Sequence, residues 1–360
     1  MQRWTLIQEE LLPELKESVN TLTPKLEKLI HTLEWLRVEE FVKSTWCGVG
    51  RIPHDRYALA NAFVAKVVLG LVTTTGLIER LTIDRALRRI CGFPMWKKVP
   101  SESTFSRAFT EFAEAKLAER VHDELIKTYL GKELIGHISR EGTAIEAREK
   151  PKAYEIKTPK PEVKKKRGRP RKEEERAAPE PTKIERQLGQ TLTQMMSELP
   201  TECDKGTKCN AQGYKQSWNG YKLHVDTADC GVPISVVLTS ASTHDSQTAI
   251  PLALLTASRV TNCYDLMDAA YCSEDIRNHS RSLGHVPLID HNPRGGEKKA
   301  FAPHEAQRYK ERSQAERTNA RIKDEFGGRQ IWVRGAKKVM SHLMFGVVVL
   351  SADVLMRLLT

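Results

Sequence analysis

Four side chains in the C-terminal part of the chain have types and spacings that could handle a phosphate group. Arg312, Glu316 and Lys323 follow Tyr309 at intervals of three, seven and fourteen residues. At about 3.6 residues per turn, these intervals place all four side chains on one stripe of a helix. Cationic groups beside a single carboxylate suit phosphate binding. Taken alone, the pattern is explained equally well by a solvated helix with an Arg–Glu salt bridge.

Two further carboxylates follow predicted strands. Asp268 comes directly after the predicted strand at residues 263–267, and Glu141 follows the predicted strand at residues 134–139. Side chains at the carboxyl ends of such strands point into the ligand crevice of an α/β sheet, which makes both acids candidate site residues. For Asp268, the alternative is the N-cap of the next helix.

Three carboxylates at two strand ends and on a facing helix would form an oxygen-rich site that suits Mg²⁺ or Mn²⁺. Two such ions about 4 Å apart can activate a water or a 3′-hydroxyl and stabilise the leaving oxygen in phosphodiester cleavage. A glycosidase-type acid pair is less well supported. Aromatic residues make up only 6% of the chain, and the cations beside Glu316 suit phosphates better than sugars.

The elements that must position these residues begin with a helical region, residues 1–130, in which leucine and isoleucine recur at three- and four-residue spacing. A helix at residues 84–90, a break at Gly92 and a helix starting at Ser101 suit a helix-turn-helix. Its second helix would offer Ser103 and Arg107 to DNA. A plain helical bundle is the alternative interpretation.

Strand patterns dominate after about residue 210. Residues 219–227 and 232–239 predict a β-hairpin, and alternating strands and helices follow. The predicted segments are a helix at 245–257, a strand at 262–267, a helix at 274–283, a strand at 285–289 and a long helix at 305–326. With residues 134–139 as the first strand, the order β-β-β-α-β-α-β-α predicts an α/β class, a mixed sheet with flanking helices after the helical region.

Basic charge is concentrated in the middle of the chain. Residues 150–186 hold fourteen basic and seven acidic residues, whereas the whole chain has a net charge of +11 and a pI near 9.2. Six prolines and few large apolar residues predict an extended insertion or linker, which we bound at residues 150–209. The surplus favours a polyanion partner, most commonly nucleic acid.

The centre of this segment contains Arg167, Gly168, Arg169 and Pro170. Glycine permits close backbone approach, proline keeps the chain extended, and two arginines fit a narrow A·T minor groove of negative potential. The motif therefore resembles an AT-hook. A solvated basic tether is the alternative.

Cysteine usage and hydropathy favour a cytoplasmic protein. Seven cysteines without a C-x-x-C pair argue against a disulfide framework and a zinc ribbon. No signal peptide is visible, and the most apolar run, residues 343–350, is shorter than the ~20 residues that a membrane span needs.

Together, these motifs resemble the DDE-type transposases of bacterial insertion sequences, whose catalytic domain is ribonuclease H-like. The helical signature Y-x2-R-x3-E-x6-K carries most of the resemblance, and residues 266–271, 289–294 and 141–147 resemble the family's second-acid, last-strand and first-acid motifs. The resemblance implies catalytic metal ligands at Glu141, Asp268 and Glu316 for two Mg²⁺ or Mn²⁺ ions. It implies phosphate-handling roles for Tyr309, Arg312 and Lys323.

The resemblance also implies a domain organisation and partners. Residues 1–130 would bind DNA and help dimerisation, and residues 131–149 with 210–360 would form the catalytic domain, which the insertion interrupts. The expected partners are double-stranded DNA, as terminal inverted repeats and target, and a second copy of the chain, without a membrane. The protein would act in the cytoplasm, at the nucleoid when bound to DNA.

Two departures from the family pattern matter. Glu141 stands where the family ordinarily has Asp, and one extra methylene moves the carboxylate by about 1 Å, which can cost ~10²-fold in rate. Attenuated cleavage, or a non-catalytic DNA-binding regulator derived from a transposase, is therefore the alternative function. Only residues 290–304 separate the last strand from the signature helix, which leaves no room for a large β insertion.

Overall fold

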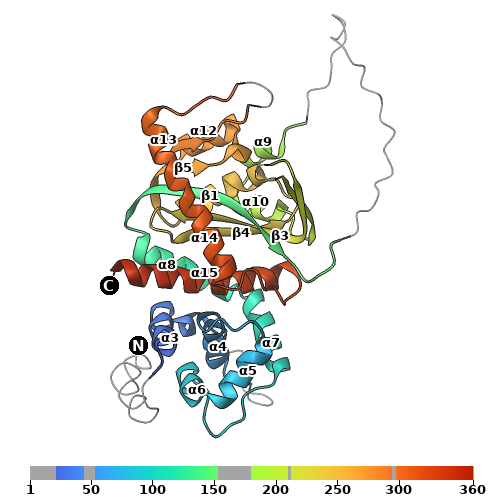
Figure 1. Cartoon of the computed structure of the whole chain (residues 1–360), viewed down its shortest axis with the longest axis vertical. Helices are drawn as coiled ribbons and strands as arrows, with labels where there is room; N and C mark the ends of the chain where they lie inside the picture. The colour runs from blue at the N-terminus through green and yellow to red at the C-terminus, as the bar shows by residue number, and fades with distance from the viewer. Residues whose placement is uncertain (1–21, 44–52, 153–179, 210–211, 294–296, 360) are drawn as a thin grey trace, which may run out of the picture.

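The computed structural model describes residues 22–43, 53–152, 180–209, 212–293 and 297–359. A group of helices, blue to green in Figure 1, precedes the sheet. It comprises α3 (Pro24–Leu36), the 3-10 turn η2 (Val38–Phe41), α4 (Arg56–Val68), α5 (Thr74–Ile83), α6 (Arg85–Cys91), α7 (Glu102–Glu114) and α8 (Leu117–Leu130). Asp55, Thr73 and Asp84 accept hydrogen bonds from N–H groups in the first turns of α4, α5 and α6, which fixes where these helices begin.

The last helix of the chain completes the core of this helical group. α15 (Ala336–Leu359) packs against α3, α4, α7 and α8, and Figure 1 shows it lying with α8 between the first helices and the sheet. By length and composition α15 could cross a membrane, but 83% of its apolar window is buried inside the fold. Its apolar sequence is therefore explained by its position as a core helix.

The described residues form one six-stranded mixed sheet. Its strands are β1 (Leu134–Glu146), β2 (Asp204–Cys209), β3 (Lys215–Ala228), β4 (Pro233–Ser240), β5 (Thr261–Met267) and β6 (Val286–Ile289). β1 runs antiparallel to β3 and parallel to β5, and β6 extends the parallel part. β2 and β4 pair with successive halves of β3. The mixed sheet is consistent with a ribonuclease H-like domain.

Helices cover both faces of the sheet. They are α9 (Lys183–Leu188), α10 (Leu192–Glu198), η3 (Asp245–Thr248), α11 (Ala249–Ala257), η4 (Ala269–Tyr271), α12 (Glu274–Ser282), α13 (Pro303–Tyr309), η5 (Lys310–Arg312) and α14 (Ser313–Asp324). Neighbouring residues of β1 define the two faces. Ser139 donates a hydrogen bond to Glu311 before α14, whereas Arg140 pairs with Asp226, which also accepts from Thr256 of α11. α14 and α11 therefore lie on opposite faces.

The first strand is longer than the sequence predicted. We expected it to end at Ser139 and Glu141 to follow it, but β1 continues to Glu146 and Glu141 lies in its middle. The pairing with β3 extends this strand, since residues Ile138 to Glu146 are all in register with that neighbour. The apolar pattern of residues 134–139 ends before Glu141, so the sequence did not predict that the strand continues along β3.

The predicted long helix at residues 305–326 is broken. The 3-10 turn η5 separates α13 from α14, so Tyr309 ends one helix, Arg312 lies in the turn, and Glu316 and Lys323 lie on the next helix. Tyr309, Arg312 and Glu316 still lie side by side, since the guanidinium of Arg312 lies 5.9 Å from the centre of the Tyr309 ring and 2.6 Å from Glu316 Oε1. The tighter turn changes the direction in which Arg312 projects relative to an ideal helix.

The segment predicted as an extended linker contains regular structure in its second half. α9, α10 and β2 lie between residues 183 and 209, and Gln187, Met195, Leu199 and Cys203 are buried. Two capping boxes, at Thr182 and Thr191, fix the starts of the two short helices. The AT-hook-like residues Arg167 to Pro170 lie outside the described residues.

The connection between α6 and α7 differs from the predicted helix-turn-helix. It runs from Gly92 to Ser101, longer than the three- or four-residue turn of that motif. On α7, Ser103 and Arg107 are exposed one turn apart, whereas Thr104 is buried. The exposed pair shares one face because residues four apart on a helix are neighbours.

Candidate active site

Glu141 and Asp268 occupy neighbouring positions on two parallel strands. The last pair in the register of β1 with β5 joins Arg140 to Met267, so the next residue of each chain segment is one of the two acids. Asp268 Oδ1 accepts a hydrogen bond from Ala270 N at 2.9 Å. Asp268 therefore directly follows β5 and is the N-cap of η4, as the alternative interpretation of its sequence position predicted.

Burial and mutual repulsion disfavour the charged forms of both acids. The pKa of Glu141 is raised to about 6, mainly by burial; Arg312 opposes this shift, and the charges of Glu316 and Asp268 contribute to it. Burial also raises the pKa of Asp268, and Asp245 adds to this shift. Carboxylates that repel one another in a partly buried crevice are a common feature of functional sites.

Arg312 links the strand acid to the helix acid. Its Nη1 lies 3.2 Å from Glu141 Oε2, and its Nη2 lies 2.6 Å from Glu316 Oε1. The carboxylates of Glu141 and Glu316 raise the pKa of Arg312 although burial acts to lower it. The guanidinium of Arg312 thus joins Glu141 of β1 to Glu316 of α14. These two ion pairs hold α14 against β1.

Tyr309 is anchored at the end of β5, beside Asp268. Its hydroxyl donates a hydrogen bond to the carbonyl oxygen of Met267 at 3.1 Å, and its ring lies 4.7 Å from that of Phe301. Burial raises the pKa of Tyr309 to about 12. The phenol therefore stays neutral and positions η5, so that Arg312 reaches the carboxylates.

Lys323 lies apart from the acids. No hydrogen bond or ion pair within the described residues joins it to Glu141, Asp268 or Glu316. Burial lowers its pKa, as do the neighbouring cations Arg329 and Lys208, against the effect of Glu146. Ser103 and Arg107 lie on α7 of the helical group, and in the described part of the chain no hydrogen bond or ion pair joins them to the acids.

Two charged residues near the acids were not predicted from the sequence. The positive charge of Lys208, on β2, lowers the pKa of both Glu141 and Asp268. Asp245 pairs with Lys222 at 2.9 Å and raises the pKa of Asp268. Lys208 lies in the segment interpreted as a linker, and Asp245 is the first residue of a predicted helix. Neither position therefore indicated a functional residue.

Gly142 permits the close approach of the Asp245 side chain. A Cβ at this position would lie 2.9 Å from Asp245 Oδ1, 3.1 Å from His224 Nδ1 and 3.2 Å from Lys222 Cδ. These atoms belong to a partly buried cluster on the opposite side of β1 from Glu141, in which only His224 is fully buried. The glycine therefore lets the cluster support the strand directly behind the acid.

The acids offer only oxygen donors, which fits Mg²⁺ or Mn²⁺. Among the residues that the structure describes, no three His, Cys, Asp or Glu side chains lie close enough to form a metal-binding group. Arg312 instead supplies the positive charge between Glu141 and Glu316. In this arrangement the guanidinium of Arg312 neutralises Glu141 and Glu316, so a divalent cation would share these two carboxylates only after Arg312 had moved.

Two family models match the chain, and both describe transposase domains. Residues 197–351 match the Transposase DDE domain, and residues 13–111 match the Transposase domain (DUF772). The comparisons with curated proteins and with solved structures gave no match. The first match includes Asp268 and Glu316, and the second includes most of the helical group, so together they support an insertion-sequence transposase of the DDE type.

Proposed function

We propose that this chain binds the ends of an insertion sequence and catalyses metal-dependent phosphodiester hydrolysis followed by strand transfer into target DNA. One observation carries the proposal. Glu141 and Asp268 are neighbours on parallel strands, and Arg312 ties Glu316 to Glu141. Carboxylates gathered in this way beside cations suit a reaction at a phosphate.

Each residue of the site has a role in this proposal. Glu141, Asp268 and Glu316 would hold two Mg²⁺ or Mn²⁺ ions, which supply Lewis acidity at the phosphate when bound. Arg312 would turn from the carboxylates to a non-bridging phosphate oxygen, since a guanidinium binds either anion in the same fork geometry. Tyr309 would keep η5 in place, and Lys323 would hold the DNA backbone further along.

DNA binding away from the acids would involve two other regions. Ser103 and Arg107 share an exposed face of α7 that could contact DNA. The AT-hook-like residues Arg167, Gly168, Arg169 and Pro170 would enter A·T-rich minor grooves. Two copies of the chain would bring two terminal inverted repeats together, because cut-and-paste joining needs both ends at one target. No observation favours the non-catalytic alternative, since Tyr309, Arg312 and Lys323 are all present.

The direct test is cleavage of DNA that carries the ends of the element. The full chain would be incubated with such DNA and Mg²⁺ or Mn²⁺, and the products mapped at nucleotide resolution. The proposal predicts nicks that expose 3′-hydroxyls at the element boundary and disappear when a chelator replaces the metal. End binding without any nick in either metal would contradict catalysis, and an absence of end binding would contradict the whole proposal.

A further inference from the structure

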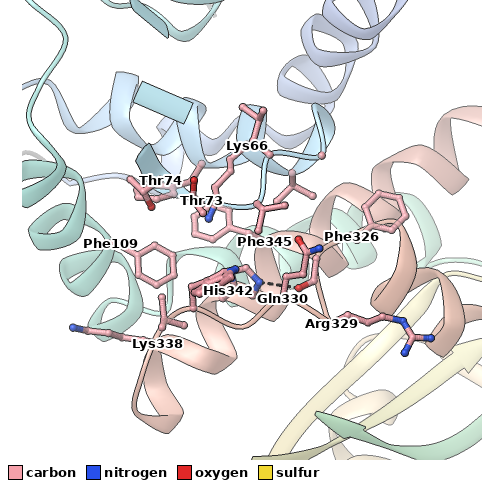
Figure 2. Close-up of a pocket in the computed structure, with 18 of the residues that line it drawn as sticks. Lys66, Thr73, Thr74, Phe109, Phe326, Arg329, Gln330, Lys338, His342 and Phe345 are labelled. Carbon is pink, nitrogen blue, oxygen red and sulfur yellow. Dashed lines mark hydrogen bonds between the residues drawn. The ribbon is translucent and has the colours of Figure 1, made fainter. Parts of the chain in front are cut away.

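A cleft of about 780 Å³ lies between the helical group and the segment that joins α14 to α15. Figure 2 shows Lys66, Thr73 and Thr74 on one wall, with His342 and Phe345 of α15 facing them. Pockets of 300–1,000 Å³ typically bury one small ligand. A DNA duplex is too wide for this cleft, whereas one or two nucleotides of a single strand could enter.

The interior of the cleft is aromatic. Phe63, Phe109 and Phe345 line it and contact one another, with ring centroids 5.0 to 6.2 Å apart. These rings come from α4, α7 and α15, so packing between the helical group and the C-terminal helix builds the surface. All three rings are at most 8% exposed, so they form the packed apolar floor of the cleft, and stacking on a base is left to rings at its rim.

The acids that line the cleft near α14 already have partners. Asp324 forms an ion pair with Arg329, and Glu325 pairs with Arg321. Five lining cations and one lining acid, Glu102, have no side-chain hydrogen bond or ion pair within the described residues; the cations are Lys66, Arg148, Lys323, Arg334 and Lys338. The cleft therefore carries unpaired positive charge, which favours an anionic ligand.

Lys66 lies deepest among these cations. Burial lowers its pKa to about 8, and its charge helps to lower the pKa of His342 to about 4. Desolvation of an ammonium group without a carboxylate partner costs free energy that a bound anion would recover. His342 stays neutral and hydrogen-bonds the carbonyl oxygen of Gly327 at 3.1 Å, so it does not supply that charge.

An exposed aromatic ring stands at the rim. Trp332 is 50% exposed, and the guanidinium of Arg148 lies 5.0 Å from the centre of its ring. An indole paired with a guanidinium is a common platform for stacking of unpaired bases. Lys323 also lines the cleft, and it lies on α14, the helix that carries Glu316. This helix connects the cleft to the acids.

We propose that this cleft binds an unpaired segment of a DNA strand, with phosphates at Lys66 and Lys338 and a base on Trp332. This inference rests on the proposed function, because the bound strand would be DNA that passes from the carboxylate site along Lys323 into the cleft. Aromatic surfaces interleaved with cations are the combination that single-stranded nucleic acids require. Phosphate alone would leave the exposed ring of Trp332 unused, and an apolar ligand would leave the cations unpaired.

The test uses fluorescein-labelled (dT)20 and a mixed-sequence 20-base-pair duplex as probes, with the full chain and a chelator present so that cleavage does not contribute. Anisotropy gives the affinity for each probe, and quenching of tryptophan fluorescence reports stacking. The variants are Lys66→Gln and Trp332→Ala. Their matched controls are Lys132→Gln and Trp96→Ala, which change an exposed lysine and a tryptophan that is 85% exposed, both outside the cleft lining.

We expect Lys66→Gln and Trp332→Ala each to weaken (dT)20 binding about 10-fold, within the range of base stacking, and to change duplex binding less than 2-fold. Trp332→Ala should also remove most of the quenching by (dT)20, whereas both controls should behave like the parent. Circular dichroism and thermal melting of each variant establish that it is folded.

Three outcomes would overturn the inference: unchanged (dT)20 affinity in both variants, quenching lost in Trp96→Ala instead, or full competition by free dTMP at equal nucleotide concentration. The last outcome would identify a small-molecule pocket. Because these assays contain no metal, the inference can fail while end cleavage is observed, and it can hold when cleavage is absent. The two proposals are therefore tested separately.

Discussion

Arg312 Nη1 lies 3.2 Å from Glu141 Oε2, so the turn before α14 is bound to the middle of the central strand. These residues are far apart in the sequence, and Arg312 is the last residue of the 3-10 turn η5. The contact neutralises an acid whose charged form burial disfavours. The same guanidinium also holds Glu316, so a change in Arg312 would release both acids at once.

Glu141 should make stability depend on pH. Its pKa is raised from 4.5 to about 6 in the folded chain, so the folded state favours the protonated form. The associated stabilisation is fully present below pH 4.5 and is lost as the pH rises through 6, which corresponds to about 2 kcal/mol. Glu141→Gln should abolish this decrease in the free energy of unfolding between pH 4 and pH 8, as measured by denaturant titration. The control is Glu146→Gln, which changes an exposed acid on the same strand. An identical pH dependence in parent and Glu141→Gln would contradict the burial of this carboxylate.

Gly142→Ala should destabilise the chain and impair cleavage. The added methyl group would press on Asp245, His224 and Lys222, and overpacking of this kind costs about 1–3 kcal/mol. Thr143→Ala, at the next position of the strand, serves as the control. Chemical denaturation measures the free energy of unfolding. Equal stability of Gly142→Ala and the parent would contradict the prediction, because it would show that the side chains behind β1 move aside at no cost.

Glu141→Asp should increase cleavage of end-bearing DNA by roughly 10²-fold or more at equal DNA affinity, if the family's shorter side chain is the productive one. The shorter carboxylate should also release Arg312 for the phosphate. Single-turnover cleavage rates measure the effect. If neither Glu141→Asp nor Glu141→Ala changes the rate, the first ligand lies elsewhere. Glu146 would then be the next acid to test, because Asp226 is fully buried and its oxygens are held by Arg140 at 2.7 Å.

The AT-hook-like motif should act on groove shape and charge. Changing Arg167 and Arg169 together to Ala should weaken binding to A·T-rich DNA by a few kcal/mol and reduce the salt slope by about 2. Titrations at several salt concentrations on A·T-rich and G·C-rich duplexes measure both effects. An equal loss on the two duplexes would favour a plain basic tether.

Sequence patterns predicted the local elements better than their long-range partners. The strand before Asp268 and the hairpin of β3 and β4 follow from apolar alternation and a glycine turn, which are local signals. The extension of β1 past Glu141 depends on pairing with β3, and η5 follows Tyr309, whose hydroxyl contacts the end of β5; both β3 and β5 are distant partners in the sequence. Lys208 and Asp245 approach the acids only through the folded sheet, so no spacing in the sequence could have placed them there.

The cooperation of Asp268 and Glu316 in cleavage is the central claim, and one comparison tests it most directly. End cleavage and end binding would be measured side by side for the parent, Asp268→Ala, Glu316→Ala and the control Glu274→Ala, which changes an exposed acid on α12. Mn²⁺ should be included because it tolerates imperfect coordination geometry. We predict that Asp268→Ala and Glu316→Ala each lose all measurable cleavage yet bind ends like the parent, because a lost metal ligand leaves groove contacts intact. Cleavage by either variant at more than a few per cent of the parent rate would contradict the claim for that residue.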